Sequence, residues 1–141
     1  MEGRICLPVE PQAETYLMAR KILIVDDEPN IVISLEFLMQ QRGYEVALAH
    51  NGEQALQQME TFRPDLVLLD VLMPSMDGYE VCRKIRERSD WGAVKIVMLS
   101  AKVRDVDISK GLALGADAYI TKPFSTRQLM ASVGDLLSAS T

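Results

Sequence analysis

The chain has 141 residues, a length that suits one domain with a single core rather than two ordinary domains. Its formal net charge is −5 and its lysines and arginines are scattered, which argues against a nucleic-acid-binding face, because neutralising phosphates needs clustered positive charge. Hydrophobic residues make up 48% of the chain without a membrane-spanning run, and Cys6 and Cys82 offer neither metal-ligand spacing nor a disulfide framework, so we expect a soluble, cytoplasmic protein.

The first 19 residues contain neither a continuous apolar segment nor a small-residue cleavage site, so they lack the features of a signal peptide. The segment MARKILIVDDE, which begins at Met18, would by itself open a domain on a strand. We therefore expect an N-terminal extension or tail over residues 1–19, one domain over residues 20–138 and a short C-terminal end over residues 139–141.

From Lys21 onward, short apolar runs alternate with segments of helical periodicity. This pattern predicts an α/β fold in which strand-helix pairs surround a parallel sheet. Gly111 interrupts the fourth helical segment, so we expect that helix to be the least stable. The predicted strands are 21–27, 44–50, 66–70, 95–100 and 117–121, and the predicted helices run from 29 to about 43, from 52 to the turn at 63–65, and over 78–88, 103–114 and 125–138.

Four of the predicted strands end on residues that carry a charge or a hydroxyl group. The carboxyl ends of parallel strands share one edge of a sheet, and α/β proteins bind their ligands there. Three neighbouring carboxylates at that edge would raise one another's pKa unless a cation joined them, and their hard oxygen ligands suit Mg²⁺. The residues in question are Asp26 and Asp27 at the end of the first strand, Asp70 on the third, Ser100 on the fourth and Lys122 after the fifth.

Asp70 ends the wholly apolar run LVLL in the middle of this arrangement. With Lys122 to hold the oxygens of a transferring phosphoryl group and Ser100 to donate a hydrogen bond, Asp70 is a candidate nucleophile that forms an aspartyl phosphate. Taken singly, each residue has a simpler interpretation: Asp27 or Ser100 could cap a helix, and Lys122 could be a solvated lysine at a strand end. The joint arrival of these side chains at one edge favours a site.

Four segments in this order, ILIVDDEP, DLVLLDVLMPSMDGYEVCRKIR, VMLSA and GLALGADAYITKPF, resemble the receiver domain of two-component response regulators, over about residues 20–138. The resemblance implies a flavodoxin-like (βα)5 fold of strand order 2-1-3-4-5 with helices on both faces. It also implies a phosphoacceptor switch in a phosphorelay rather than an enzyme, with at most self-phosphorylation from acyl-phosphate donors and self-dephosphorylation.

The resemblance carries residue roles with it. Asp70 would be the phosphoacceptor, Ser100 the switch hydroxyl and Lys122 the phosphate-binding lysine. Tyr119 would be the switch aromatic, although it could also be an ordinary half-buried strand residue. The Lys122–Pro123 bond is expected to be cis.

The same resemblance implies a Mg²⁺ site and a moving surface. The metal ligands would be Asp27, Asp70 and the backbone carbonyl of Leu72, with Asp26 acting through water. Phosphorylation would draw the loop of Ser100 inward, let Tyr119 turn in, and reshape the face built from the predicted segments 103–114, 117–121 and 125–138.

The implied partners are proteins. The phosphoryl donor would be a histidine kinase or a histidine phosphotransfer protein, and the output target would be another protein of unknown identity, with no direct nucleic-acid or membrane contact. A phosphorylation-dependent homodimer is a further expectation. Neither the cognate donor nor the target follows from the sequence.

Two positions near the acceptor vary within the family, and here they are Leu72 and Lys102, which follow Asp70 and Ser100 by two residues. We expect them to set the phosphoryl lifetime, with Leu72 covering the acyl phosphate without orienting an attacking water. An alternative function is a Mg²⁺-dependent aspartate-nucleophile phosphohydrolase, which normally needs a general acid where this chain has Leu72. A flavodoxin-type cofactor binder would need a Ser/Thr/Gly-rich loop where this chain has DDEPN.

Overall fold

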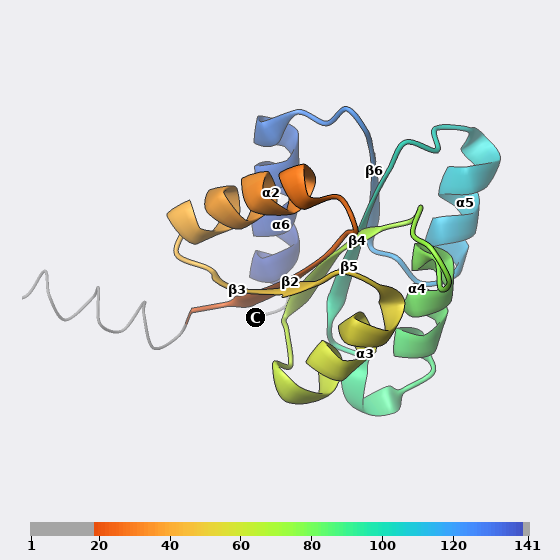
Figure 1. Cartoon of the computed structure of the whole chain (residues 1–141), viewed down its shortest axis with the longest axis horizontal. Coiled ribbons are helices and arrows are strands. Elements are labelled where there is room, and N and C mark those ends of the chain that lie inside the picture. Colours follow the sequence, from red (N-terminus) through yellow and green to blue (C-terminus); the bar gives the residue numbers. More distant parts are fainter. Residues whose placement is uncertain (1–18, 140–141) are drawn as a thin grey trace, which may run out of the picture.

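A parallel sheet of five strands forms the centre of the protein in the computed structural model, which describes residues 19–139 (Figure 1). The order β3-β2-β4-β5-β6 equals the predicted order 2-1-3-4-5 when strands are counted along the chain, so the flavodoxin-like fold is confirmed. The predicted tail up to residue 18 and the last two residues lie outside the described part. The strands are β2 (Lys21–Val25), β3 (Glu45–Ala49), β4 (Leu66–Asp70), β5 (Lys95–Ser100) and β6 (Ala118–Thr121).

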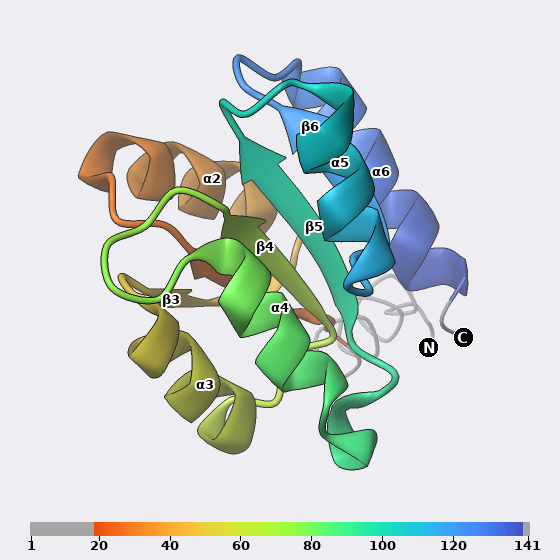
Figure 2. The ribbon, with the colours of Figure 1, turned by 90° about the vertical axis from the view of Figure 1, so that its right-hand side faces the viewer.

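Helices cover both faces of the sheet. Between residues 19 and 139 they are α2 (Pro29–Gln41), α3 (Gly52–Thr61), α4 (Gly78–Arg86), the short 3-10 helix η1 (Ser89–Trp91), α5 (Asp105–Ala113) and α6 (Thr126–Ala139). Helices α2 and α6 lie on one face, and α3, α4 and α5 on the other (Figures 1 and 2). All five predicted α-helices are present, with ends that differ from prediction by a few residues, as the last turns of helices commonly do.

Burial of the strands on both faces explains their continuous apolar runs. In β2 and β4, Ile22 and Leu66 join the cluster under α2 and α6, whereas Leu23 and Val67 join the cluster under α3 and α4. Successive side chains of a strand point to opposite faces, so a strand covered by helices on both sides needs apolar residues at every position. The two clusters therefore fix the register of the central strands.

Polar side chains cap the first turns of two helices. The Asn51 side chain accepts a hydrogen bond from the Gln54 N–H (2.8 Å) at the start of α3, and the Ser125 hydroxyl accepts one from the Gln128 N–H (3.2 Å) at the start of α6. No helix between residues 19 and 139 has both the length and the apolar content needed to cross a bilayer.

Candidate functional site

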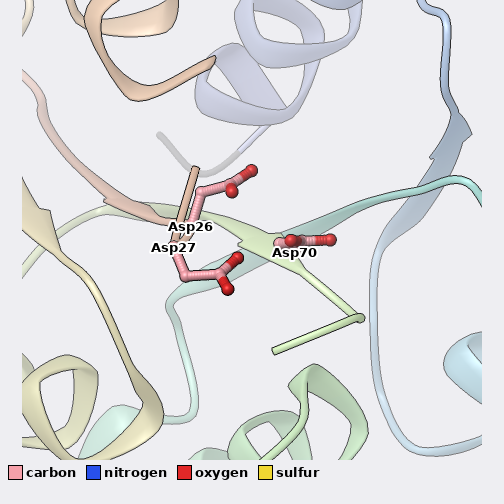
Figure 3. A group of neighbouring side chains, drawn as sticks. All are labelled: Asp26, Asp27 and Asp70. Atoms are coloured by element: carbon pink, nitrogen blue, oxygen red, sulfur yellow. The ribbon is translucent and has the colours of Figure 1, made fainter. Parts of the chain in front are cut away.

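Three carboxylates meet at the carboxyl ends of β2 and β4. Asp26 and Asp27 directly follow β2, and Asp70 is the last residue of β4. The carboxylates come close together because these two strands are neighbours in the sheet. One carboxylate oxygen from each residue lies within 4.8 Å of the others (Figure 3). Asp26 and Asp70 are buried, whereas Asp27 is exposed, so the group, which we call the acidic cup, has two buried walls and one open side.

Lys122 brings a positive charge to the acidic cup from the end of β6. Its Nζ lies 3.2 Å from Oδ2 of Asp26 and 3.6 Å from Oδ1 of Asp70. The backbone holds this position, since the Lys122 N–H donates to the Ser100 carbonyl (2.8 Å). The Lys122–Pro123 peptide bond that follows is cis, as expected. The predicted nucleophile, acidic pair and lysine are therefore together, although 96 positions separate Lys122 from Asp26 in the chain.

Burial raises the pKa of Asp70 from its ordinary value of 3.8 to about 6. Repulsion from Asp26 adds to this rise, and Asp27 contributes a smaller part. Lys122 and the N–H of Leu72, which donates to Oδ1 of Asp70 (3.2 Å), oppose it. The single lysine thus does not offset the desolvation and the mutual repulsion of these carboxylates.

The donor set of the acidic cup fits a hard divalent cation. Mg²⁺ prefers carboxylate oxygens and retains part of its water shell, and the cup offers three carboxylates with one side open to solvent. A cation there would also relieve the repulsion that raises the pKa of Asp70. The residues present therefore match the chemistry expected of a Mg²⁺ site.

The simpler interpretations of single residues do not hold. The cap of α2 is Glu28, which makes no side-chain cap hydrogen bond, so Asp27 is not the cap of that helix. Asp26 instead accepts from the Glu28 N–H (2.9 Å), which orients its carboxylate. The cap of α5 is Arg104, so Ser100 does not cap that helix either.

Ser100 and Tyr119 meet at one residue of the loop between β5 and α5. The Ser100 Oγ accepts from the Lys102 N–H (3.0 Å), and the Tyr119 hydroxyl donates to the Lys102 carbonyl (2.9 Å). Ser100 is fully buried and Tyr119 is half-buried against the cluster under α3 and α4. The ammonium of Lys102 lies 3.9 Å from Oδ1 of Asp107, at the start of α5.

The loop between β4 and α4 lies against the backbone of Asp70. The Gly78 N–H donates to the Val71 carbonyl (2.9 Å), and a Cβ at position 78 would lie 2.3 Å from the carbonyl oxygen of Asp70. Only glycine allows this approach. Leu72, the other loop residue of interest, leaves about half of its surface exposed.

Some functional candidates were not foreseen in the sequence. Asp77 caps α4 by accepting from the Glu80 N–H (3.0 Å), for which the pattern Asp-x-x-Glu before a helical segment was an available signal. Tyr79 donates from its hydroxyl to the Asp107 carbonyl (3.0 Å), and no local pattern could indicate a contact between residues 28 positions apart.

A surface depression of about 770 Å³ lies beside the acidic cup and not over it. Residues of the loops after β3 and β4 line it, including His50 and Met76. His50 is exposed and no carboxylate of the acidic cup lines this depression, so its shape adds nothing to the chemistry at Asp70.

Comparison with known proteins gives one consistent result. A family model described as the response regulator receiver domain matches residues 22–134. A crystal structure of a response regulator from Chloroflexus aurantiacus is 36% identical with a TM-score of 0.81, covering 85% of this chain and 98% of that one. The chemotaxis protein CheY4 of Vibrio cholerae is 31% identical with a TM-score of 0.79, covering 84% of this chain and 98% of that one. The BeF3-activated DrrB receiver domain is 35% identical with a TM-score of 0.77, covering 85% of this chain and 98% of that one.

Proposed function

The chain belongs to the response regulator receiver domain family, and from this premise we propose that Asp70 accepts a phosphoryl group from a histidine kinase or a histidine phosphotransfer protein. Membership assigns the protein to phosphorelay signalling in two-component systems, in which receiver domains are generally phosphoacceptor switches rather than classical enzymes. The observation that carries the proposal is the convergence of Asp70 with the other carboxylates and with Lys122 at one sheet edge. We take residues 20–138 as the receiver domain, which the match to residues 22–134 supports.

The proposed transfer is an in-line displacement at phosphorus. An oxygen of Asp70 forms the new P–O bond, the P–N bond to the donor's imidazole breaks, and the imidazole takes up a proton from solvent. The raised pKa of Asp70, about 6, still leaves the carboxylate ionised at neutral pH and therefore nucleophilic. Lys122 is close enough to Asp70 to contact the oxygens of the incoming group and stabilise their negative charge.

Receiver domains bind Mg²⁺ at an acidic pocket, and the acidic cup has the ligands for it. We propose that Asp27, Asp70 and the backbone carbonyl of Leu72 hold the ion, with Asp26 acting through water. When bound, Mg²⁺ would neutralise part of the charge that gathers on the phosphoryl oxygens. The buried Asp26 also keeps Lys122 in place through their 3.2 Å ion pair.

The proposed response runs from Ser100 through Tyr119 to the face of α5, β6 and α6. A phosphoryl group on Asp70 adds acceptor oxygens, so the Ser100 hydroxyl gains a partner and its loop is drawn toward the site. Tyr119 on β6 follows that movement, because its hydroxyl donates a hydrogen bond to the carbonyl of Lys102, which belongs to this loop. The surface of α5 then presents a different shape to a protein output target.

A homodimer formed on phosphorylation is a further part of the proposal. Val103, in the loop before α5, and Val106, in its first turn, are exposed by 57% and 63%, so apolar surface is available on the face that we expect to change. Size measurement of the full chain before and after phosphorylation tests this point, and an unchanged monomer in both states would contradict it.

The central experiment is incubation of the full chain with Mg²⁺ and a small acyl-phosphate donor, followed by intact mass measurement. We expect one phosphoryl adduct on the wild type and none on Asp70→Asn. Asp135→Asn is the matched control, since Asp135 is exposed on α6, and it should be phosphorylated like the wild type. An adduct on Asp70→Asn would show that another residue is the acceptor. Steady release of phosphate from small phosphomonoesters would favour a phosphohydrolase instead.

A further inference from the structure

Two tyrosines from different elements donate hydrogen bonds to the segment that follows Ser100. Tyr119 of β6 donates to the Lys102 carbonyl (2.9 Å), and Tyr79 of α4 donates to the Asp107 carbonyl (3.0 Å). The side chains of the two accepting residues also approach each other, with the Lys102 ammonium 3.9 Å from Oδ1 of Asp107. Segment 102–107 is therefore held at both ends by phenolic hydroxyls.

Tyr79 fixes the first turn of α5 relative to α4. Its side chain is buried, and burial together with the adjacent Tyr119 hydroxyl raises the pKa of Tyr79, so the phenol remains a neutral donor. The Asp107 carbonyl belongs to the first turn of α5 and has a second lone pair beyond the one used within the helix. Moving this turn away would leave a buried hydroxyl without a partner, which costs more than an ordinary hydrogen bond contributes.

One turn further along, α5 lies directly against the ring of Tyr119. A Cβ at Gly111 would lie 2.7 Å from Sδ of Met98 and 3.0 Å from Cδ2 of Tyr119. The absence of a side chain at Gly111 thus brings the helix backbone onto the ring. The position of α5, which Tyr79 sets, consequently determines how much space the ring of Tyr119 has.

The other end of this chain of contacts is Ser100. Its Oγ accepts from the Lys102 N–H, so its own hydrogen is available for a different acceptor. A phosphoryl group on Asp70 would supply that acceptor and would favour the arrangement in which Lys102 is bonded to both Ser100 and Tyr119. Hydrogen bonds in series strengthen one another, so the state of Asp70 and the position of α5 become linked.

Building on the proposed phosphorylation of Asp70, we propose that Tyr79 is a positioning residue whose hydroxyl holds α5 so that Tyr119 reaches Lys102. It thereby couples phosphorylation of Asp70 to the position of α5. At equilibrium such coupling is reciprocal, so loss of the Tyr79 hydroxyl weakens the effect of phosphorylation on α5. Because we take the phosphoryl transfer itself to pass through the arrangement that Tyr79 holds, the same loss slows phosphorylation.

The test uses the full chain with Tyr79→Phe, Tyr119→Phe, the double variant and Tyr44→Phe. The last is a matched control, because Tyr44 packs on the opposite face of the sheet, beside the cluster under α2 and α6. Three quantities are measured for each protein: the rate of phosphorylation by a small acyl phosphate with Mg²⁺, the Mg²⁺ affinity, and amide hydrogen exchange over α5 (Asp105–Ala113) with and without the phosphoryl group.

We expect Tyr79→Phe to slow phosphorylation about fivefold, the size of effect that loss of one hydrogen bond produces, and to leave the Mg²⁺ affinity unchanged. The control Tyr44→Phe should match the wild type in all three quantities. In the double variant with Tyr119→Phe, the fold-reduction in rate should be smaller than the product of the two single fold-reductions, since both hydroxyls act through segment 102–107. Phosphorylation should protect α5 against exchange less in Tyr79→Phe than in the wild type.

The opposite outcomes are distinct. A Tyr79→Phe variant with the rate and the exchange pattern of the wild type would overturn the role of Tyr79, and so would single effects that multiply fully in the double variant. A purely structural role would lower the unfolding temperature without this non-additivity. Failure of the wild type to acquire a phosphoryl group, or an adduct on Asp70→Asn, would instead overturn the proposed function beneath it.

Discussion

The buried charge of Asp70 leads to a quantitative prediction: Asp70→Asn stabilises the metal-free protein at neutral and alkaline pH. Burial and repulsion raise the pKa of this carboxyl from 3.8 to about 6, so the folded state binds a proton that the unfolded state has already released. Stability therefore falls as pH rises from about 4 to about 6, and the full penalty is present above that window. Such a difference in pKa corresponds to an upper bound of about 3 kcal/mol.

The asparagine side chain has the same shape and keeps an oxygen that can accept from the Leu72 N–H, so the substitution removes mainly the charge. We expect Asp70→Asn to raise the free energy of unfolding by about 1–3 kcal/mol at pH 8, and the gain should vanish below pH 4, where the wild-type carboxyl is protonated in both states.

Urea unfolding in EDTA at pH 8, 6 and 4 measures this difference, with Asp135→Asn as a control that should change nothing at any of these pH values. Titrating groups that do not interact with Asp70 cancel when the two proteins are compared at one pH. A variant that is less stable than the wild type at pH 8, or a gain that is the same at pH 8 and pH 4, would refute the reasoning.

Three more predictions concern the same edge of the sheet. Mg²⁺ should raise the unfolding midpoint of the wild type by an amount that grows with the logarithm of its concentration above the Kd, and should raise that of Asp70→Asn much less, because a ligand stabilises only the state that binds it; equal shifts in a thermal melt would contradict the proposed ligand set. Gly78→Ala should cost about 3 kcal/mol in urea unfolding, since its Cβ would lie 2.3 Å from the Asp70 carbonyl oxygen, whereas Gly134→Ala, with nothing within 4 Å, should be neutral or stabilising; equal effects of the two changes would disprove this interpretation of the loop. Leu72→Asn should lose its phosphoryl group faster than the wild type when phosphate release is followed after removal of the donor, because an amide can orient a water that Leu72 excludes; a slower loss would contradict it.

The local pattern of the sequence was enough to predict the elements and the fold. The run LVLL before Asp70 is apolar at every position because helices cover both faces of β4, and this physical requirement is visible in four consecutive letters. Asn51 and Ser125 cap α3 and α6 with hydrogen bonds that reach only three residues ahead, so helix starts too depend on short-range sequence. The simpler interpretations of Asp27 and Ser100 as helix caps are wrong, because Glu28 occupies the cap position of α2 and Arg104 that of α5.

The residues of the acidic cup were also named correctly as neighbours, although no local pattern connects them. That prediction depended on the rule that carboxyl ends of parallel strands share an edge, and on the resemblance to receiver domains. Their chemical roles remain proposals to be tested by phosphorylation and metal binding. The contacts of Lys102 could not be predicted in this way. Its ammonium lies beside Asp107, and its backbone forms hydrogen bonds with the side chains of both Ser100 and Tyr119.

The sequence by itself determined where strands and helices lie, which strand ends carry reactive groups and which family the chain resembles, because each of these is written in short-range periodicity or in motifs of a few residues. Only the tertiary structure decided how strongly burial raises the pKa of Asp70. Only the tertiary structure, too, brought the hydroxyl of Tyr79 on α4 to the backbone of α5. Both depend on which groups displace water around a side chain, and that is a property of packing between residues far apart in the chain.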